Sequence, residues 1–400
     1  MAKQAVKKGA GVKKSGLDAF KERKGMVYKP GEKEKFSNAE KPLSWIPMPR
    51  CFQEVTKLNG IPEGMVVMAM GHSNTGKSVM INHAMINSIK YNNLIPVFFD
   101  TENAFSFQFA TQMGLDATPV YDDVEVEDVS KETGEVTYHT EKQIVNWDGE
   151  FLYYSSKILA DQYGYWDHSQ GKQTNKKRTE AVIEDIAMCI NELLDAQENG
   201  EINKGFLFIW DSVGSIDCYK SYAAKVSNNM WNANAISVCM NRIVNSRIPG
   251  SKAVNGPSPY TNTMLIINKI WLDSMSNPVG IPIMRTKGGS SLGYSVRLCF
   301  QLGSQLTSGV KRLTATYKSA TYSFAIETKI KVTKNHLDAP HNVCYEGSLI
   351  ACDLGFIGVD ELDEYKKTHI SKIIKELEKL SGESGITEKD ITFQEVEEEE

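Results

Sequence analysis

Four short stretches of almost uninterrupted apolar residues constrain the fold of this chain more than any other feature. They cover residues 64–71, 94–100, 205–211 and 263–268, and segments with helical periodicity separate them. A strand that is apolar at nearly every position is buried on both faces, which is typical of parallel strands between two layers of helices. We therefore predict an α/β core with a doubly wound, mostly parallel sheet.

The stretch GHSNTGKS, residues 71–78, lies between the first apolar run and a segment with helical periodicity. It fits the pattern G-x-x-x-x-G-K-[ST] at every position, which predicts a loop whose backbone N–H groups converge on phosphate oxygens at the start of a helix. We expect Lys77 to reach the β and γ phosphates of a nucleoside triphosphate and Ser78 to bind Mg²⁺. The predicted phosphate-binding residues are Gly71, His72, Ser73, Asn74, Thr75, Gly76, Lys77 and Ser78.

Carboxylates follow two of the other apolar runs. Asp211 ends the third run, where an acid is the usual second magnesium ligand of such a site, although a strand-terminal aspartate that caps a turn is the alternative. Asp100 and Glu102 follow the second run, and the carboxyl end of a parallel strand borders the nucleotide crevice. Either can orient or deprotonate an attacking water, and their spacing alone does not choose between them.

The termini and the cysteines exclude several classes of protein. The first sixteen residues carry five lysines and no acid, and the chain ends in EVEEEE, so we expect two solvated tails or interaction arms. The seven cysteines show no CxxC spacing, which favours free thiols over a disulfide or zinc framework. The sequence has no run of 18 apolar residues and its basic start lacks an apolar segment, so we expect neither a membrane span nor a secretory signal.

Changes in composition along the chain predict three regions. Residues 1–44 form a basic arm with one short helix at 17–24, residues 45–345 form the core, and residues 346–400 hold a helix at about 361–380 and a polar, acidic tail. Residues 118–180 are expected to be an insertion that adds no strand to the core sheet: a hairpin with a Glu-Thr-Gly turn, then a tyrosine-rich and basic segment. This insertion fits a secondary DNA site or a subunit contact equally well.

Several motifs together resemble the RecA-type recombinases, most closely their phage, UvsX-like branch. The resemblance is carried by the loop at 71–78, by FFDTENAFSFQFATQMGLD and by FIWDSVGSI, and it covers roughly residues 45–118 and 180–345. It implies a RecA-like P-loop ATPase core that uses ATP and Mg²⁺. It also implies that Glu102 is the catalytic base and that Phe109 stacks on the adenine.

Two further motifs imply a switch and a DNA-binding surface. MLIINKIW is similar to the family strand that ends in an asparagine and a polar switch residue, here Asn268 and Lys269, although the family has Gln or His at the second place. RTKGGSSLGYSVR resembles the Thr-x-Gly-Gly signature after the second DNA-binding loop, which makes residues 271–287 the candidate loop; a simple surface loop is the alternative. The implied DNA-binding residues are Met230, Trp231, Arg242, Arg285, Lys287, Gly288 and Gly289, with a core or interface role as the alternative for Trp231.

The stretch IKVTKNHLDAP, residues 330–340, resembles the Lys-Asn-Lys element that reaches the ATP of the neighbouring subunit. The equivalent residues are Lys334 and His336, of which the histidine is a departure, because it is a weaker permanent charge. The alternative is a solvent-exposed basic pair.

The resemblance implies a DNA-dependent ATPase that forms helical filaments on single-stranded DNA and exchanges strands with double-stranded DNA. ATP would lie at the interfaces of a homo-oligomer, and single-strand-binding and loader proteins are possible partners. We expect a cytoplasmic protein, in the host cytoplasm if a phage encodes it. Two alternatives remain: a hexameric replicative helicase, for which residues 1–44 are too short to form the additional N-terminal domain, and a regulatory ATP-binding scaffold.

Overall fold

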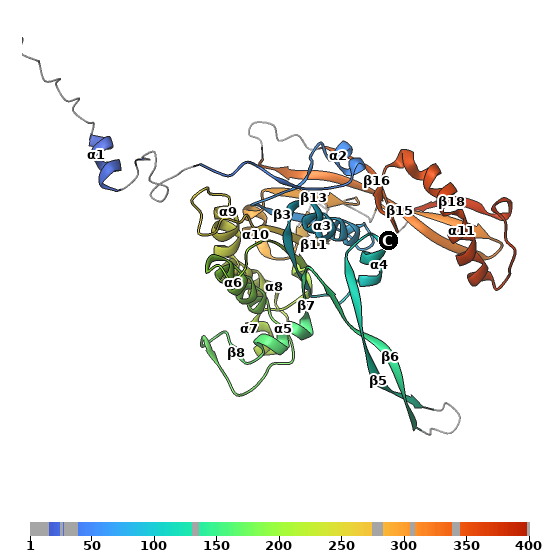
Figure 1. Ribbon diagram of the computed structural model, residues 1–400, viewed down its shortest axis with the longest axis horizontal. Helices are drawn as coiled ribbons and strands as arrows, with labels where there is room; N and C mark the ends of the chain where they lie inside the picture. The colour runs from blue at the N-terminus through green and yellow to red at the C-terminus, as the bar shows by residue number, and fades with distance from the viewer. Residues whose placement is uncertain are drawn as a thin grey trace, which may run out of the picture.

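A computed structural model of the protein describes residues 16–24, 27, 39–129, 136–273, 283–304, 309–337 and 345–397. At residues 16, 128–129, 271–273, 283–285, 290 and 291 only the backbone is described. The main helices are α1 (Gly16–Arg23), α2 (Arg50–Thr56), α3 (Lys77–Asn92), α4 (Phe107–Gln112), α5 (Ser156–Tyr163), α6 (Ile183–Glu198), α7 (Tyr219–Ala224), α8 (Asn229–Cys239), α10 (Gly289–Ser295) and α11 (Leu362–Ser381) (Figure 1).

The central sheet has the order β17-β16-β15-β13-β3-β11-β10-β4-β7, with β12 paired to β11, and β14 to both β15 and β18. Its strands are β3 (Val66–Gly71), β4 (Leu94–Asp100), β7 (Leu152–Ser155), β10 (Gly205–Asp211), β11 (Thr263–Asp273), β12 (Ile283–Thr286), β13 (Leu298–Leu302), β14 (Lys311–Tyr317), β15 (Ala320–Asn335), β16 (Glu346–Cys352), β17 (Gly355–Ile357) and β18 (Thr392–Glu397). The four predicted strands are confirmed as β3, β4, β10 and β11, and they pair in parallel at its centre.

The sheet is mixed, so the prediction of a mostly parallel sheet is correct only for the part from β13 to β7. From β13 to β7 the strands are parallel, whereas β12, β14, β15, β16, β17 and β18 pair antiparallel. Some of the antiparallel neighbours are joined by short connections, such as the turn at residues 318–319 between β14 and β15. Two-residue turns of this kind can only join antiparallel neighbours.

Two helical layers cover the central strands, as the apolar runs predict. Along β10, Phe206, Phe208 and Trp210 face the layer that includes α6 and α8, while Leu207 and Ile209 face the layer that includes α3. All five side chains are fully buried. This alternation explains why the run GFLFIWD has no polar position before Asp211.

Residues 118–180 depart from the prediction that they add no strand to the core. The hairpin is confirmed as β5 (Ala117–Val129) and β6 (Val136–Gly149), with its predicted turn outside the described residues, and it projects from the body as a ribbon (Figure 1). The following residues form β7, which pairs in parallel with β4 and adds an edge strand. Tyr154 stacks on Phe99 with ring centroids 5.4 Å apart. The half-buried strand LYYS lacks the continuous apolar run that marks a central strand.

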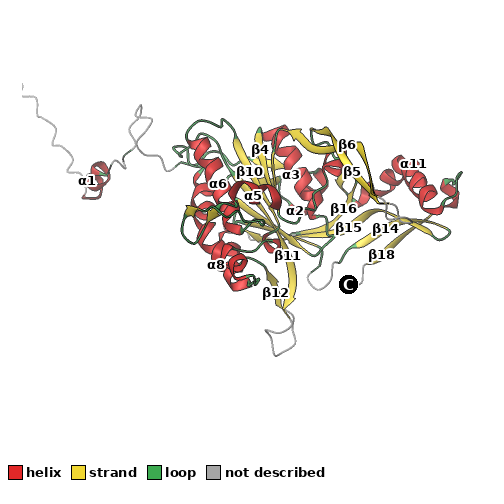
Figure 2. Ribbon diagram, turned by 90° about the horizontal axis from the view of Figure 1, so that it is seen from below, coloured by secondary structure: helices red, strands yellow, loops and turns green. Residues whose placement is uncertain are grey.

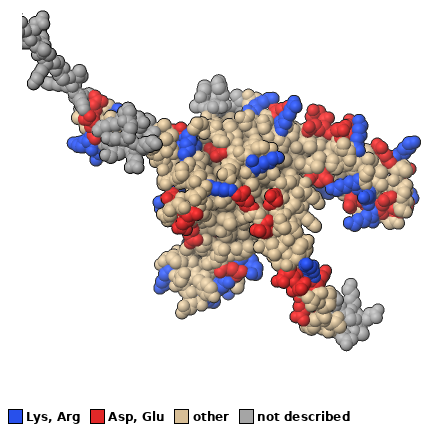
Figure 3. All heavy atoms as spheres, viewed as in Figure 1, with Lys and Arg blue, Asp and Glu red and all other residues tan. Residues whose placement is uncertain are grey.

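The ribbon carries a strong negative charge (Figure 3). Asp122, Asp123, Glu125 and Glu127 are all exposed on β5. Carboxylates repel a phosphate backbone, so this part of the insertion does not suit a DNA site. The basic run at residues 172–178 lies next to the short strands β8 (Trp166–Asp167) and β9 (Lys172–Gln173). Lys177 pairs with Asp161 and Arg178 is buried against Asp185, so the run keeps only part of the positive charge that such a site needs.

The C-terminal helix and strand pack with β14 and β15 on the antiparallel side of the sheet. We call β14, β15, α11 and β18 the C-terminal unit. The predicted helix is confirmed as α11, which packs on β14 and β15 through a core that includes Leu313, Phe324, Ile373 and Leu377. The expectation of a solvated acidic tail is wrong for Glu395–Glu397, since these residues belong to β18 and pair with β14. Charged side chains on such an edge strand stay exposed while the backbone pairs, so charge alone did not reveal the strand.

The predictions for the arm and the cysteines can be compared in part. The short arm helix is confirmed as α1. The six cysteines within the described residues are free thiols. No helix in the described part of the chain is both long and apolar enough to cross a membrane. At the start of the core, β1 (Trp45–Pro47) pairs with β2 (Gly60–Pro62).

Candidate functional site

The loop at residues 71–78 joins the central strand β3 to α3, and its backbone needs glycine at two positions. A Cβ on Gly71 would lie 2.4 Å from the carbonyl oxygen of Leu302, which leaves no room for a side chain. Gly76 has φ +91°, in the left-handed region that favours glycine. The Thr328 hydroxyl of β15 donates to the carbonyl of Thr75 at 3.0 Å and fixes the loop against the antiparallel strands.

A cleft of about 650 Å³ lies over this loop. It brings together most of the residues that the sequence predicts to bind ATP, from positions far apart in the chain. Those that line it are Ser73, Asn74, Thr75, Gly76, Lys77, Ser78, Glu102, Phe109, Asp211 and Lys269. Gly71 and His72 do not line the cleft, and the carbonyl of His72 accepts a hydrogen bond from Lys77.

Lys77 is held close to its own loop. Its amino group donates to the carbonyl of Gly71 at 3.2 Å and to that of His72. Burial lowers the pKa of Lys77 to about 8, although Asp211 and Glu102 oppose this shift. A lysine in this state gains strongly from a bound anion, because the anion restores the charge stabilisation that burial removes.

Glu102 faces the cleft and Asp100 does not, so the structure separates the two carboxylates that the sequence left as alternatives. Asp100 is buried, and its oxygens accept hydrogen bonds from the backbone N–H groups of Ala104 and Phe105 and from the Tyr153 hydroxyl. These bonds shape the turn after β4. Only Glu102 is therefore free to act on a molecule in the cleft.

The Glu102 carboxylate sits in a polar network. Its Oε1 accepts hydrogen bonds from Ser212 at 2.5 Å and Ser215 at 2.7 Å, and its Oε2 lies 2.9 Å from the Lys269 amino group. Burial would raise the pKa of Glu102, but the hydrogen bonds from Ser212, Lys269 and Ser215 outweigh burial and lower it. Glu102 is thus ionised near neutral pH, and it suits orienting a water molecule better than storing its proton.

Asp211 ends β10 in the same cleft and has the opposite electrostatics. Burial, together with the nearby Glu102 and Asp100, raises the pKa of Asp211 to about 7. A divalent cation would favour the ionised form of Asp211, because its positive charge compensates the buried negative charge. The Asp211 carboxylate and the Ser78 hydroxyl are hard oxygen ligands, and Mg²⁺ typically takes one or two such protein groups plus substrate phosphates. The residues present therefore fit a magnesium ion.

Asn268 links the cleft to the Gly288-Gly289 turn. Asn268 is fully buried in the middle of β11, next to Lys269, and its side-chain amide donates to the carbonyl of Lys287 at 2.7 Å. Its Oδ1 is buried without a hydrogen-bond partner among the described residues. Lys287 in turn donates from its amino group to the carbonyl of Gly214 at 2.9 Å.

Four of the predicted DNA-binding residues lie together beside this turn. Met230, which is 81% exposed, lines a cavity of about 200 Å³ with Lys287, Gly288 and Gly289. Gly288 and Gly289 have φ +98° and +73°, and a Cβ on Gly289 would lie 3.0 Å from Ala233. The side chain of Arg285 and residues 274–282 lie outside the described residues, while β11 and β12 run out of the sheet together (Figure 2).

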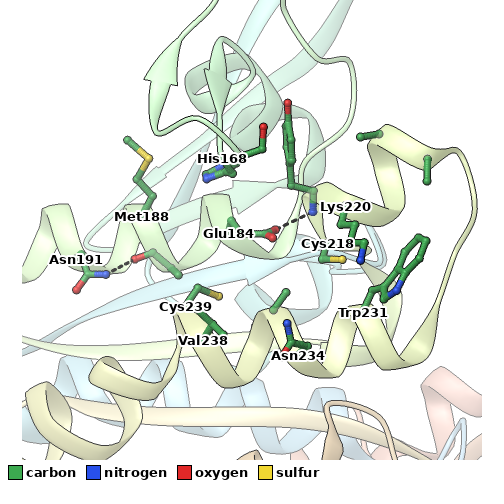
Figure 4. A pocket seen from close by; sticks show the side chains of 16 residues that line it. His168, Glu184, Met188, Asn191, Cys218, Lys220, Trp231, Asn234, Val238 and Cys239 are labelled. Atoms are coloured by element: carbon green, nitrogen blue, oxygen red, sulfur yellow. Dashed lines mark hydrogen bonds between the residues drawn. The ribbon is translucent and has the colours of Figure 1, made fainter.

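Trp231 and Arg242 are not among the residues that line this cavity. Arg242 is exposed after α8. Trp231 lines a larger groove of about 1040 Å³ between α6, α7 and α8, and the Lys220 amino group lies 4.4 Å from its ring centroid (Figure 4). This placement supports the alternative of a packing or interface role for Trp231.

Lys334 and His336 do not line the cleft of their own chain. The Lys334 amino group donates to the carbonyls of Gly293 and Tyr294 at 2.8 and 3.2 Å, at the C-terminal end of α10. Burial lowers the pKa of Lys334. His336 is exposed at the end of β15. Neither residue therefore contributes to the cleft of its own chain.

Sequence reasoning missed two hydroxyls that hold Glu102 and one arginine of the cleft. Ser212 and Ser215, which donate to Glu102, follow within four residues of Asp211 in DSVGS, and this closeness in sequence is the signal that could have found them. Arg312 lines the cleft from β14, more than two hundred residues from the loop, and no local pattern marks it. No protein-family model and no curated protein matches the sequence.

Proposed function

We propose that this protein is a DNA-dependent ATPase of the RecA type that assembles on single-stranded DNA and catalyses homologous pairing and strand exchange. The observation that carries the proposal is the hydrogen bond from Asn268 to the Lys287 carbonyl. This bond connects β11, whose Lys269 lines the cleft, to the Gly288-Gly289 turn, which lies beside the exposed Met230. A nucleotide-driven DNA-binding protein needs a physical connection of this kind between its two sites.

The chain's own residues suggest how ATP would be hydrolysed. The loop at 71–78 and Lys77 bind the phosphates, and Glu102 orients water in line with the γ-phosphate. Ser212 and Ser215 hold the carboxylate in place. Lys269 shares that carboxylate, so a γ-phosphate that attracts Lys269 would shift β11 and the Asn268 bond with it.

Ser78 and Asp211 would hold Mg²⁺, which would neutralise charge on the phosphates. Because Lys334 and His336 lie away from their own cleft, we propose that they act on the ATP of a neighbouring copy in the filament. A site completed by two copies makes hydrolysis depend on assembly.

ATP hydrolysis with and without saturating single-stranded DNA tests this function. We expect DNA to raise the rate at least tenfold, and electron microscopy with a non-hydrolysable ATP analogue to show helical filaments. Closed six-membered rings would favour a helicase instead. A rate that DNA leaves unchanged would favour an ATP-binding scaffold and contradict the proposal.

A further inference from the structure

The C-terminal unit supplies one wall of the nucleotide cleft. Arg312 of β14 and Ser323 and Ile326 of β15 line the cleft together with the loop of the core. Arg312 lies opposite Ile326 on one side and Val396 of β18 on the other, so its backbone is fixed between two strands. This wall is therefore part of the same sheet that carries the loop.

The direction of the Arg312 side chain follows from its strand. The next residue, Leu313, is 2% exposed and packs in the core of the C-terminal unit with α11. Successive side chains of a strand point to opposite faces, so Arg312 points away from α11 and toward the cleft. The Thr328 bond to Thr75 keeps this wall at a fixed position relative to the loop.

Among the described residues, three cationic side chains line the cleft, namely Lys77, Lys269 and Arg312. A guanidinium is always charged and presents donors in a planar fork that matches two phosphate oxygens at once. Arg312 therefore brings to the cleft the group best suited to a phosphate.

We propose that Arg312 binds a phosphate group of the nucleotide from the same chain that supplies the loop. Bound nucleotide then connects the core to the C-terminal unit directly. This inference rests on the ATP-binding part of the proposed function and is independent of DNA.

The test is MgATP binding to the full-length chain, measured by titration calorimetry, for Arg312→Ala, Arg312→Lys and the control Lys311→Ala. Lys311 is the preceding residue of β14, does not line the cleft, and pairs with Glu327 and Glu395. We expect Arg312→Ala to weaken ATP binding about 10- to 100-fold, because it removes charge-assisted hydrogen bonds. Arg312→Lys should lose less, and Lys311→Ala should bind within about twofold of wild type.

Adenosine competition identifies the group that Arg312 binds. Arg312→Ala and the wild type should bind adenosine, which has no phosphate, with equal affinity. Thermal melting should show that the variant keeps its fold. Wild-type affinity for ATP in Arg312→Ala, or an equal loss for adenosine, would overturn the inference.

The same titrations separate this inference from the proposed function. A wild-type chain that binds no ATP contradicts both. If Lys77→Ala abolishes ATP binding while Arg312→Ala does not, only the role of Arg312 fails. If Arg312→Ala weakens ATP binding but DNA does not stimulate hydrolysis, the role of Arg312 stands and the recombinase proposal fails.

Discussion

At the scale of single residues, the cleft assigns different tasks to three carboxylates that lie close together. Asp100 accepts hydrogen bonds within the turn that follows β4. The hydrogen-bond donors around Glu102 lower its pKa, whereas burial raises the pKa of Asp211 to about 7. Pairs of acids whose environments move their pKa values apart are typical of catalytic sites.

Glu102→Gln should abolish hydrolysis while ATP still binds. The amide keeps the size of the side chain but cannot accept a proton or orient water in the same way, so we expect a loss of about 10²- to 10⁴-fold in rate. Steady-state hydrolysis and calorimetry measure the two effects. As a control, Asp100→Asn should mainly lower stability, by about 1–3 kcal/mol, because it disturbs three hydrogen bonds. Equal hydrolysis by Glu102→Gln and wild type would contradict the role of Glu102.

Asp211→Asn should stabilise the protein at neutral pH when neither Mg²⁺ nor nucleotide is bound. The folded pKa of Asp211 is about 7, above its ordinary value, so ionisation disfavours the folded state and stability falls as pH rises toward 7. Without Mg²⁺ or nucleotide, we expect Asp211→Asn to melt about 2–4 °C higher at pH 8 and about equally at pH 4. Calorimetric melting at both pH values measures this; a lower melting temperature at pH 8 would be inconsistent with the raised pKa.

At the scale of elements, a buried ion cluster fastens the inserted segment after β7 to the core. Arg178 donates to both oxygens of Asp185 at 2.7 and 3.0 Å, and His168 lies 2.7 Å from the same carboxylate. Asp185 is fully buried at the start of α6, and the backbone N–H of Val182 also donates to it. The cluster ties residues 163–185 to one point of the fold.

Arg178→Met should destabilise the protein by about 3–5 kcal/mol, because it leaves the buried Asp185 without its main partner. The neighbouring Lys177→Met is the matched control. Lys177 forms an ion pair with Asp161 in which both side chains are more than a third exposed, so its loss should leave the urea midpoint almost unchanged. Urea unfolding of both variants measures the difference, and similar midpoints would show that the cluster adds no stability.

At the scale of the whole molecule, one sheet extends from the inserted β7 to the C-terminal unit, with the phosphate loop after the central strand β3. The predicted trans residues lie at the end of β15, outside the cleft of their own chain. This separation is what a site shared between neighbouring copies requires.

Mixing two inactive variants should restore activity if Lys334 acts in trans. Glu102→Gln inactivates the cleft of its own copy, and Lys334→Ala removes the lysine that its copy would supply to the cleft of the next copy. In an equal mixture about a quarter of the interfaces would pair an intact cleft with an intact Lys334, so we expect up to about a quarter of wild-type ATPase activity. Each variant alone gives the baseline, and a mixture no faster than the mean of the two would contradict the trans role.

The sequence by itself determined the elements whose cause is local. The loop at 71–78 with β3 and α3, the buried runs β4, β10 and β11, and the helices α6 and α11 all follow from spacing within a few turns of chain. The strand β18 was missed because backbone pairing with β14 leaves no mark in a run of exposed acids.

Only the tertiary structure decided which groups share the cleft. It separated Glu102 from Asp100 through the bonds that Asp100 makes to Ala104, Phe105 and Tyr153, and it brought Arg312 of β14 to the cleft over the loop at 71–78. Both outcomes depend on contacts between residues distant in sequence. Local periodicity cannot encode such contacts, because the order of strands in the sheet sets them.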